Sequence, residues 1–282
     1  MTQTYTSFSA DDLRLLAPFM KIGILATVNP DGLPHLTMIS SLRPNTPSQL
    51  TWGQFVEGTS KQYIRQNPKV GFLMMTLQKD LWRGKATFTH TATQGPEYDF
   101  YNNVPMFRYN AYFGIHTVYF MDLVSQLGRQ PLPMNKIVPA AIGTILAKTL
   151  APSRAQHQPL NLWTRTLLNK LDTLKFLAYV DADGYPVIVP VIQAQAAGSG
   201  HVLFSTGAYG EDLARVPAGA KVAVFGLALT MEDVLLRGEF EGIRRFGGMR
   251  YGRVRVDWVY NSMPPAPGQI YPALPLEPVR EF

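Results

Sequence analysis

Four consecutive residues have the chemistry to bind an anion. Gly58-Thr59-Ser60-Lys61 places a flexible backbone, two hydroxyl groups and an ammonium group at one point of the chain. The segment 57–66 predicts a helix that begins here, with Thr59 or Ser60 as its N-cap. The free backbone N–H groups of a helix start, together with hydroxyl and ammonium donors, suit a phosphate. The alternative is an ordinary N-cap followed by a solvated lysine.

A second group of charged residues lies in the segment 242–255, which contains five arginines: Arg244, Arg245, Arg250, Arg253 and Arg255. One interpretation is a solvated turn followed by a strand with one polar face. The other is an edge that binds anions. The sequence leaves both open.

The composition excludes several other kinds of site. The 282 residues include no cysteine, so there are no disulfides and no thiolate chemistry, and the five histidines lack the spacing of a zinc site. The net charge is +6, but the lysines and arginines are dispersed and no nucleic-acid module is recognisable. No stretch is long and apolar enough for a membrane helix, and the first residues lack the features of a signal peptide. We therefore expect a cytoplasmic protein without nucleic-acid or membrane partners.

The sequence contains an internal repeat. Asp31-Gly32 and Asp183-Gly184 lie 152 residues apart. Each follows an apolar run, and in each case one residue separates the glycine from a proline. The same offset aligns Leu50-Thr51-Trp52 with Val202-Leu203-Phe204, and Lys69-Val70-Gly71-Phe72 with Lys221-Val222-Ala223-Val224. With a drift of two residues, 81–85 aligns with 235–239. A duplicated chain is the simplest explanation of this self-similarity.

Each copy reads mainly as strands. Alternating and β-branched residues predict strands at 23–28, 34–40, 49–53, 69–77 and 81–93, and copy 2 repeats this pattern from 178 to 260. Each Asp-Gly would supply the positive φ of a hairpin turn. Between the copies, 137–150 and 160–174 read as helices. We therefore expect a mainly β protein of two barrels in tandem, with domains at 1–150 and 151–282 and a linker near 151–159.

The order of these motifs resembles a known family. It resembles the order in the pyridoxamine 5′-phosphate oxidase-like FMN-binding split barrels. That order is a strand, an Asp-Gly-x-Pro turn, further strands, Gly-Thr-Ser-Lys, a helix and Asn-Pro-Lys-Val. The resemblance covers about residues 20–95, and more weakly 174–240. It implies an FMN cofactor held by seven residues: His35, Ser40, Trp52, Gly53, Thr59, Ser60 and Lys61. For Trp52, a plain core role is an equal alternative.

The match has departures. Relatives often carry arginine or lysine where this chain has His35 and Ser40, and frequently arginine at Ser60, so the positive charge is reduced. In copy 2, Glu211, Asp212 and Leu213 replace the three residues after the glycine, and carboxylates repel a phosphate. We expect copy 1 to bind the phosphate and copy 2 to act as a structural partner that shields the flavin ring, in a monomeric pseudo-dimer or a homodimer.

The resemblance implies an FMN-dependent oxidoreductase with a small-molecule substrate that the sequence does not identify. Flavin chemistry needs no catalytic triad, because the ring is the reactive group. Arg83, Lys85 and the arginines of 244–255 could face the cofactor cleft. One alternative is a non-catalytic protein that binds flavin, deazaflavin or haem, with His90, His116 or His157 as an axial ligand. A further alternative is a structural module without a cofactor.

Overall fold

The computed structural model describes residues 3–55, 57–105, 114–150, 157–230, 232–246, 248–261 and 268–274. Most of the expected linker at 151–159 lies outside these residues. Within the described residues, no helix has the length and apolar character that crossing a membrane requires. The chain divides into two compact units, one of residues 1–132 and 180–188 and one of residues 133–179 and 189–282.

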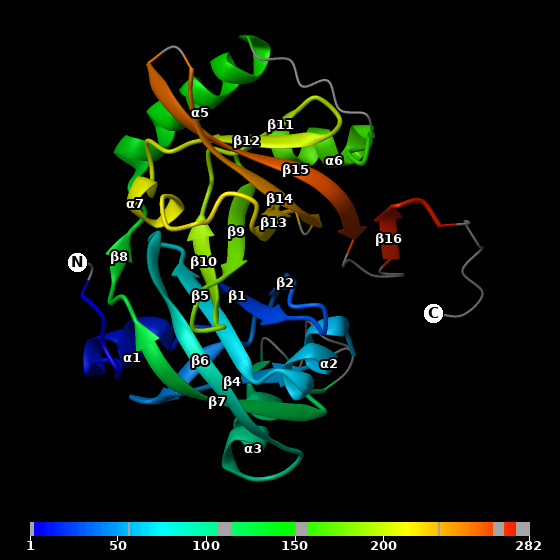
Figure 1. Cartoon of the computed structure of the whole chain (residues 1–282). Coiled ribbons are helices and arrows are strands. Elements are labelled where there is room, and N and C mark those ends of the chain that lie inside the picture. Colours follow the sequence, from blue (N-terminus) through cyan, green and yellow to red (C-terminus); the bar gives the residue numbers. More distant parts are fainter. Residues whose placement is uncertain are drawn as a thin grey trace. The chain divides into compact units, whose positions relative to one another are not determined.

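Unit 1 contains a sheet with strand order β2-β1-β5-β6-β7-β4-β3, with β8 paired to β6 (Figure 1). Its strands are β1 (Lys21–Val28), β2 (Pro34–Met38), β3 (Arg43–Thr46), β4 (Gln49–Gln54), β5 (Lys69–Thr76), β6 (Asp80–Ala92), β7 (Thr117–Gln126) and β8 (Gln130–Pro131). Its helices are α1 (Ala10–Leu16), α2 (Thr59–Gln66) and α3 (Pro96–Asn103). All pairings are antiparallel.

The second sheet, most of which belongs to unit 2, has strand order β10-β9-β13-β14-β15-β12-β11, with β16 paired to β15 (Figure 1). The strands are β9 (Leu174–Val180), β10 (Pro186–Pro190), β11 (Gln195–Ala197), β12 (His201–Ser205), β13 (Lys221–Leu227), β14 (Asp233–Phe246), β15 (Met249–Asn261) and β16 (Gly268–Tyr271). The helices of unit 2 are α5 (Met134–Leu150), α6 (Leu162–Asn169) and α7 (Gly210–Leu213).

The two sheets share one strand order, position by position, which confirms the prediction of a mainly β protein with two similar sheets. The two Asp-Gly turns also share their geometry. Gly32 has φ 75° and Gly184 has φ 81°, a region that glycine enters without steric cost. In each turn the glycine N–H donates to the backbone carbonyl of the residue three positions earlier, which is Asn29 in the first turn and Asp181 in the second. The predicted hairpins are therefore confirmed in both copies.

The helix between the copies belongs to unit 2 by its contacts. The expected division at 150/151 would leave α5 with the first domain, whereas α5 packs against β11 and β12. Thr144 on α5 accepts a hydrogen bond from the backbone N–H of Ser205 at 2.9 Å, and the Gly143 carbonyl accepts one from Tyr251 at 3.2 Å. These bonds fasten the helix to the second sheet.

The core of unit 1 fixes the position of α2. Strand β5 is buried on both faces, as its nearly unbroken apolar run predicts. Ile64 on α2 is fully buried in the same cluster as Phe72, Trp52 and Trp82. Because one face of this short helix is held by the core, the start of α2 has a defined place beside β2.

Candidate functional site: the start of helix α2

The N-cap of α2 is Gly58, not Thr59 or Ser60 as the sequence predicts. Gly58 has an extended backbone and no side chain to cap the helix. The first N–H groups of a helix have no partner within it, so the first turn of α2 retains donors for another acceptor. The prediction was wrong because the Thr59 hydroxyl makes a long-range contact instead.

That contact joins α2 to β2. Thr59 Oγ1 lies 3.1 Å from His35 Nε2, at hydrogen-bond distance. His35 is buried, lies opposite Thr27 in the β1–β2 pairing, and packs edge-to-face on the Tyr63 ring with centroids 5.3 Å apart. The imidazole is therefore held between a strand and a helix, with its Nε2 at the helix start.

Lys61 adds an ammonium group at the same point. A Cβ atom placed on Gly58 would lie 3.7 Å from Lys61 Nζ, so the lysine side chain folds back over the start of its own helix. Burial lowers the pKa of Lys61, and the nearby Glu57 carboxylate partly opposes this. A partly desolvated ammonium group gains from an anionic partner, because the partner replaces the water that burial removed.

A second layer of contacts surrounds this point, and sequence analysis missed it. Arg65 Nη2 donates to Tyr119 Oη at 3.0 Å, and Tyr119 donates to Gln54 Oε1 at 3.0 Å. Gln54 Nε2 in turn donates to Glu57 Oε2 at 2.5 Å. One signal could have identified part of it, since Arg65 follows Lys61 by four residues and so shares its helix face.

The structure brings together three of the seven predicted residues, His35, Thr59 and Lys61. Ser60 is adjacent in sequence, but its side chain is buried. Ser40 lies in a turn beyond the end of β2, and within the described residues no hydrogen bond connects it to α2. These two side chains stay outside the group at the helix start.

Trp52 and Gly53 are parts of the core. Trp52 is fully buried and stacks on Tyr119, with ring centroids 4.0 Å apart and planes 9° apart. Gly53 donates its N–H to Ser41 Oγ at 3.0 Å, and an added Cβ would lie 2.4 Å from Ile115 Cδ1. Close packing thus favours glycine at this position, and Trp52 fills the core of unit 1, while its contact with a flavin stays a prediction.

The equivalent position in unit 2 has a different chemistry. Helix α7 has four residues, half the length of α2, and its first turn carries Glu211 and Asp212. Leu213, which aligns with Lys61, is buried. At the same offset of 152 residues, Val187 in the second sheet aligns with His35, so neither the imidazole nor the ammonium group has a counterpart there.

Other predicted cations and haem ligands are used locally. Lys85 forms ion pairs with Asp181 at 2.9 Å and Asp183 at 2.7 Å, all within unit 1, and these raise its pKa. Arg83 donates to the Gln130 side chain and the Ile188 carbonyl.

The three histidines considered for haem have different surroundings. His90 stacks on Phe120 with centroids 4.4 Å apart, and His116 Nδ1 lies 2.7 Å from Thr117 Oγ1, while His157 is exposed. Among the described residues, no group of three or more metal-ligating side chains could hold a metal ion.

No protein-family model matches the sequence, and no curated protein matches it. Several solved structures are similar in part. An FMN-binding protein from Syntrophomonas wolfei subsp. wolfei is 15% identical, with 43% of this chain and 84% of that one covered and a TM-score of 0.35. A putative pyridoxamine 5′-phosphate oxidase from Lactobacillus delbrueckii is 17% identical, with 43% and 94% covered and a TM-score of 0.35. An F420 reductase is 17% identical, with 40% and 93% covered and a TM-score of 0.33. Likeness at this level does not say what this chain binds.

Proposed function

We propose that unit 1 binds FMN, with the phosphate at the start of α2, and that the protein is an oxidoreductase of the pyridoxamine 5′-phosphate oxidase-like family. The observation that carries the proposal is the convergence of His35, Thr59 and Lys61 on an N-terminus whose N-cap has no side chain. Together they offer two polar side-chain groups, one cation and free amides to one anion. The proposed cofactor would supply the hydride or single-electron chemistry.

Each residue has a distinct task in this proposal. Lys61 supplies the charge that a dianionic phosphate needs. Thr59 donates its hydroxyl hydrogen, and His35 fixes the orientation of that hydroxyl through Nε2. Arg65, held by Tyr119, adds a second positive charge to the same helix face. The Glu57 carboxylate reduces the net positive charge at this point.

We also propose that the chain arose by internal duplication and that unit 2 has no flavin site of its own. The shared strand order and the matching glycine turns support the duplication. The two carboxylates of the four-residue helix α7 support the loss, because they would repel a phosphate. Unit 2 would then have a structural role in the duplicated chain.

The test compares FMN with riboflavin, which lacks only the phosphate. Binding is measured by quenching of flavin fluorescence in wild-type protein and in Lys61→Ala. We expect wild type to prefer FMN, and Lys61→Ala to lose about 1.5–3 kcal/mol of FMN binding while riboflavin binding stays unchanged. Lys136→Ala, which removes an exposed lysine from α5, is the matched control and should bind like wild type.

Two results would contradict the proposal. Equal FMN affinity in wild type and Lys61→Ala would exclude the α2 start as the phosphate site. Wild-type protein that binds neither flavin would exclude the cofactor. Oxidoreductase activity is tested separately, by anaerobic addition of NADPH or NADH to the loaded protein, where bleaching of the flavin absorption band is the expected result. A band that stays unchanged with both donors would favour a binding protein over an enzyme reduced by nicotinamides.

A further inference from the structure

Unit 2 has a cavity of its own, far along the chain from the residues of the proposed flavin site. Its volume is about 370 Å³, within the range of small-molecule sites. Its polar lining consists of His201, Glu241, Arg253, Arg255 and Asp257, from strands β12, β14 and β15, and of His157, which precedes α6. Tyr271 and Pro272, at the end of β16, add an aromatic and an apolar surface.

Strand geometry explains why these side chains gather. Arg253, Arg255 and Asp257 alternate along β15 and so lie on one face of the sheet. His201 on β12 lies directly opposite Arg255 in the strand register. Glu241 on β14 lies at a register shift between Phe240 and Ile243, where an irregular strand can redirect a side chain.

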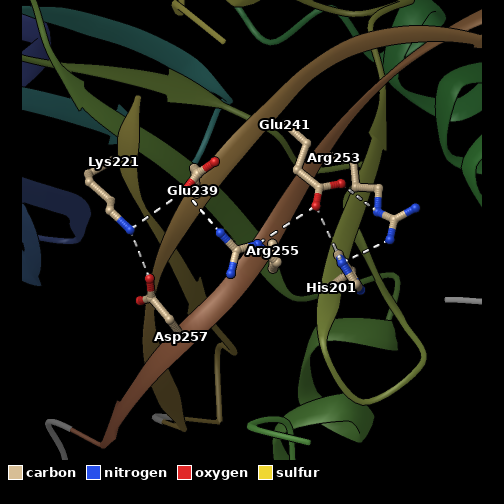
Figure 2. Close-up of polar contacts among 7 residues, drawn as sticks. All are labelled: His201, Lys221, Glu239, Glu241, Arg253, Arg255 and Asp257. Carbon is tan, nitrogen blue, oxygen red and sulfur yellow. Dashed lines mark hydrogen bonds and ion pairs between the residues drawn. The ribbon is translucent and has the colours of Figure 1, made fainter. Parts of the chain in front are cut away.

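The two guanidinium groups are fixed from one side (Figure 2). Glu241 bridges them, with Oε2 at 3.0 Å from Arg253 Nε and Oε1 at 3.8 Å from Arg255 Nε. Arg255 Nη2 also lies 2.9 Å from Glu239 Oε2. Arg253 Nη2 lies 2.8 Å from His201 Nε2. Carboxylates and an imidazole thus hold both arginines in place without a ligand.

Within the described part of the chain, the other side of each guanidinium has no hydrogen-bond or ion-pair partner. Among the described residues, Nη1 of Arg253 and Nη1 of Arg255 make no hydrogen bond or ion pair, and Figure 2 shows one terminal nitrogen of each without a contact. His201 is buried, and burial together with the neighbouring arginines lowers its pKa, so it accepts a hydrogen bond from Arg253 as a neutral ring. Two pre-oriented donor groups therefore remain at a cavity wall.

The fold itself does not require these charges. In unit 1, the register of β4 with β7 puts Asp122 at the position of Arg255 and Phe120 at the position of Arg253. Asp122 there accepts a hydrogen bond from Gln49, which aligns with His201. The same sheet order is thus built with an acid and an aromatic ring in place of the two arginines.

We propose that Arg253 and Arg255 bind the oxyanion of a small organic acid, with the organic part of the ligand against Tyr271 and Pro272. A guanidinium presents parallel N–H donors that match a carboxylate or a phosphate, and two of them at one wall give charge and direction together. His201 and Glu241 position the arginines and do not contact the ligand. This inference is independent of the proposed flavin site.

The test uses two probes that differ in their anion, benzoate and phenyl phosphate, measured by titration calorimetry. We expect wild-type protein to bind at least one of them, and the preferred probe identifies the anion class. Arg255→Gln should weaken that binding about ten- to hundredfold, the effect of losing a charged hydrogen-bond donor. Arg255→Lys should weaken it less, because the charge remains and the planar fork is lost.

Lys136→Gln is the matched control. Lys136 is exposed on α5 and does not line the cavity, so this variant should bind the probe with wild-type affinity. Phenyl phosphate could also occupy the start of α2, so each titration is repeated in Lys61→Ala protein. Binding lost in Lys61→Ala but kept in Arg255→Gln would overturn the proposal.

A second measurement on wild-type protein keeps the test valid if the arginine variants fold poorly. A bound oxyanion offsets the positive charge of Arg253 and so raises the pKa of His201, which proton NMR of the imidazole can follow. A His201 titration curve that is unchanged at saturating probe would overturn the proposal, as would the absence of binding by either probe at millimolar concentration.

Discussion

The two units contain sheets with the same strand order, but their polar side chains lie at different positions. At the helix after the fourth strand, unit 1 has Thr59 and Lys61 on an eight-residue helix, whereas unit 2 has Glu211 and Asp212 on a four-residue helix. On the last long strand the relation is reversed. Unit 2 has two arginines there, at the positions of Phe120 and Asp122 in unit 1.

The difference shows what the fold needs and what it leaves free. The corresponding strands β5 and β13 are apolar along almost their whole length, and the turn glycines Gly32 and Gly184 both have positive φ. Helix starts and outward strand faces tolerate opposite charges, because their side chains do not fill the core. Candidate sites in two units with the same strand order are therefore best sought where the side chains of the two units differ.

The largest expected effect concerns the pH dependence of stability. It comes from two buried lysines, Lys21 at the start of β1 and Lys175 at the start of β9. Lys21 Nζ donates to the Pro18 carbonyl at 2.8 Å, and Lys175 Nζ donates to the Lys170 and Ile192 carbonyls at 2.9 and 3.2 Å. Burial lowers the pKa of Lys21 to about 7 and that of Lys175 to about 8. The native state then binds fewer protons than the unfolded state between these values and about 10.5.

Stability should therefore rise with pH from about 7 to 10.5 through Lys21, and from about 8 to 10.5 through Lys175. Each contributes up to about 1.4 kcal/mol per pH unit, so several kcal/mol across its window. Urea unfolding at intervals between pH 7 and 10 checks this. In Lys21→Met, the rise of stability with pH should be flatter from pH 7 upward. In Lys175→Met, it should be flatter only from pH 8 upward. Tyrosine titration changes the stability of wild type and variants equally, so it cancels in the comparison. Identical slopes in all three proteins would contradict the lowered pKa values.

A second prediction tests whether the two sheets obey the same packing rule. Gly84 and Gly238 occupy aligned positions beside register shifts in β6 and β14. A Cβ on either would lie 2.1 Å from a backbone carbonyl oxygen, that of Ser125 or Arg255, which neither sheet can move cheaply. Gly84→Ala and Gly238→Ala should each destabilise their own unit by about 3 kcal/mol, as overpacking does.

Denaturant unfolding followed by circular dichroism measures both effects. Gly268→Ala is the control, because an added Cβ there meets nothing within 4 Å and the residue has no positive φ. Its stability should stay within about 0.5 kcal/mol of wild type. A large loss in one sheet and none in the other would show that the aligned glycines have different roles.

Much of the fold could be predicted from the sequence, because it depends on local patterns. The apolar run of 69–77, the alternation of the flanking strands and the Asp-Gly turns each specify a strand or a turn from neighbouring residues alone. The offset of 152 residues then extends each prediction to the other copy. The helix 160–174 was predicted too long, because α6 ends at Asn169 and Leu174 begins a strand.

The candidate sites could be predicted only in part, because they depend on contacts between distant residues. The sequence indicates an anion site at Gly58–Lys61, but not that the Thr59 hydroxyl meets His35 and leaves Gly58 as the N-cap. The sequence leaves Trp52 equally suited to line a flavin or to fill the core, and it does not reveal the stacking on Tyr119. In unit 2, the alternation of 251–257 predicts one polar strand face, but not the irregularity that brings Glu241 between two arginines.

The smallest expected effect concerns the bond between His35 and Thr59, which unit 2 lacks. His35→Ala and Thr59→Val should each weaken FMN binding by about 1 kcal/mol, the net value of one hydrogen bond. Together they should weaken it by less than the sum, because Nε2 and Oγ1 are partners at 3.1 Å and the first change already removes the contact. Fluorescence titration of the four proteins of this cycle gives the coupling.

Glu211→Ala, at the position that aligns with Thr59, should leave FMN binding unchanged. Strict additivity would mean that the two side chains reach the ligand separately, and an effect of Glu211→Ala would mean that unit 2 contributes to binding.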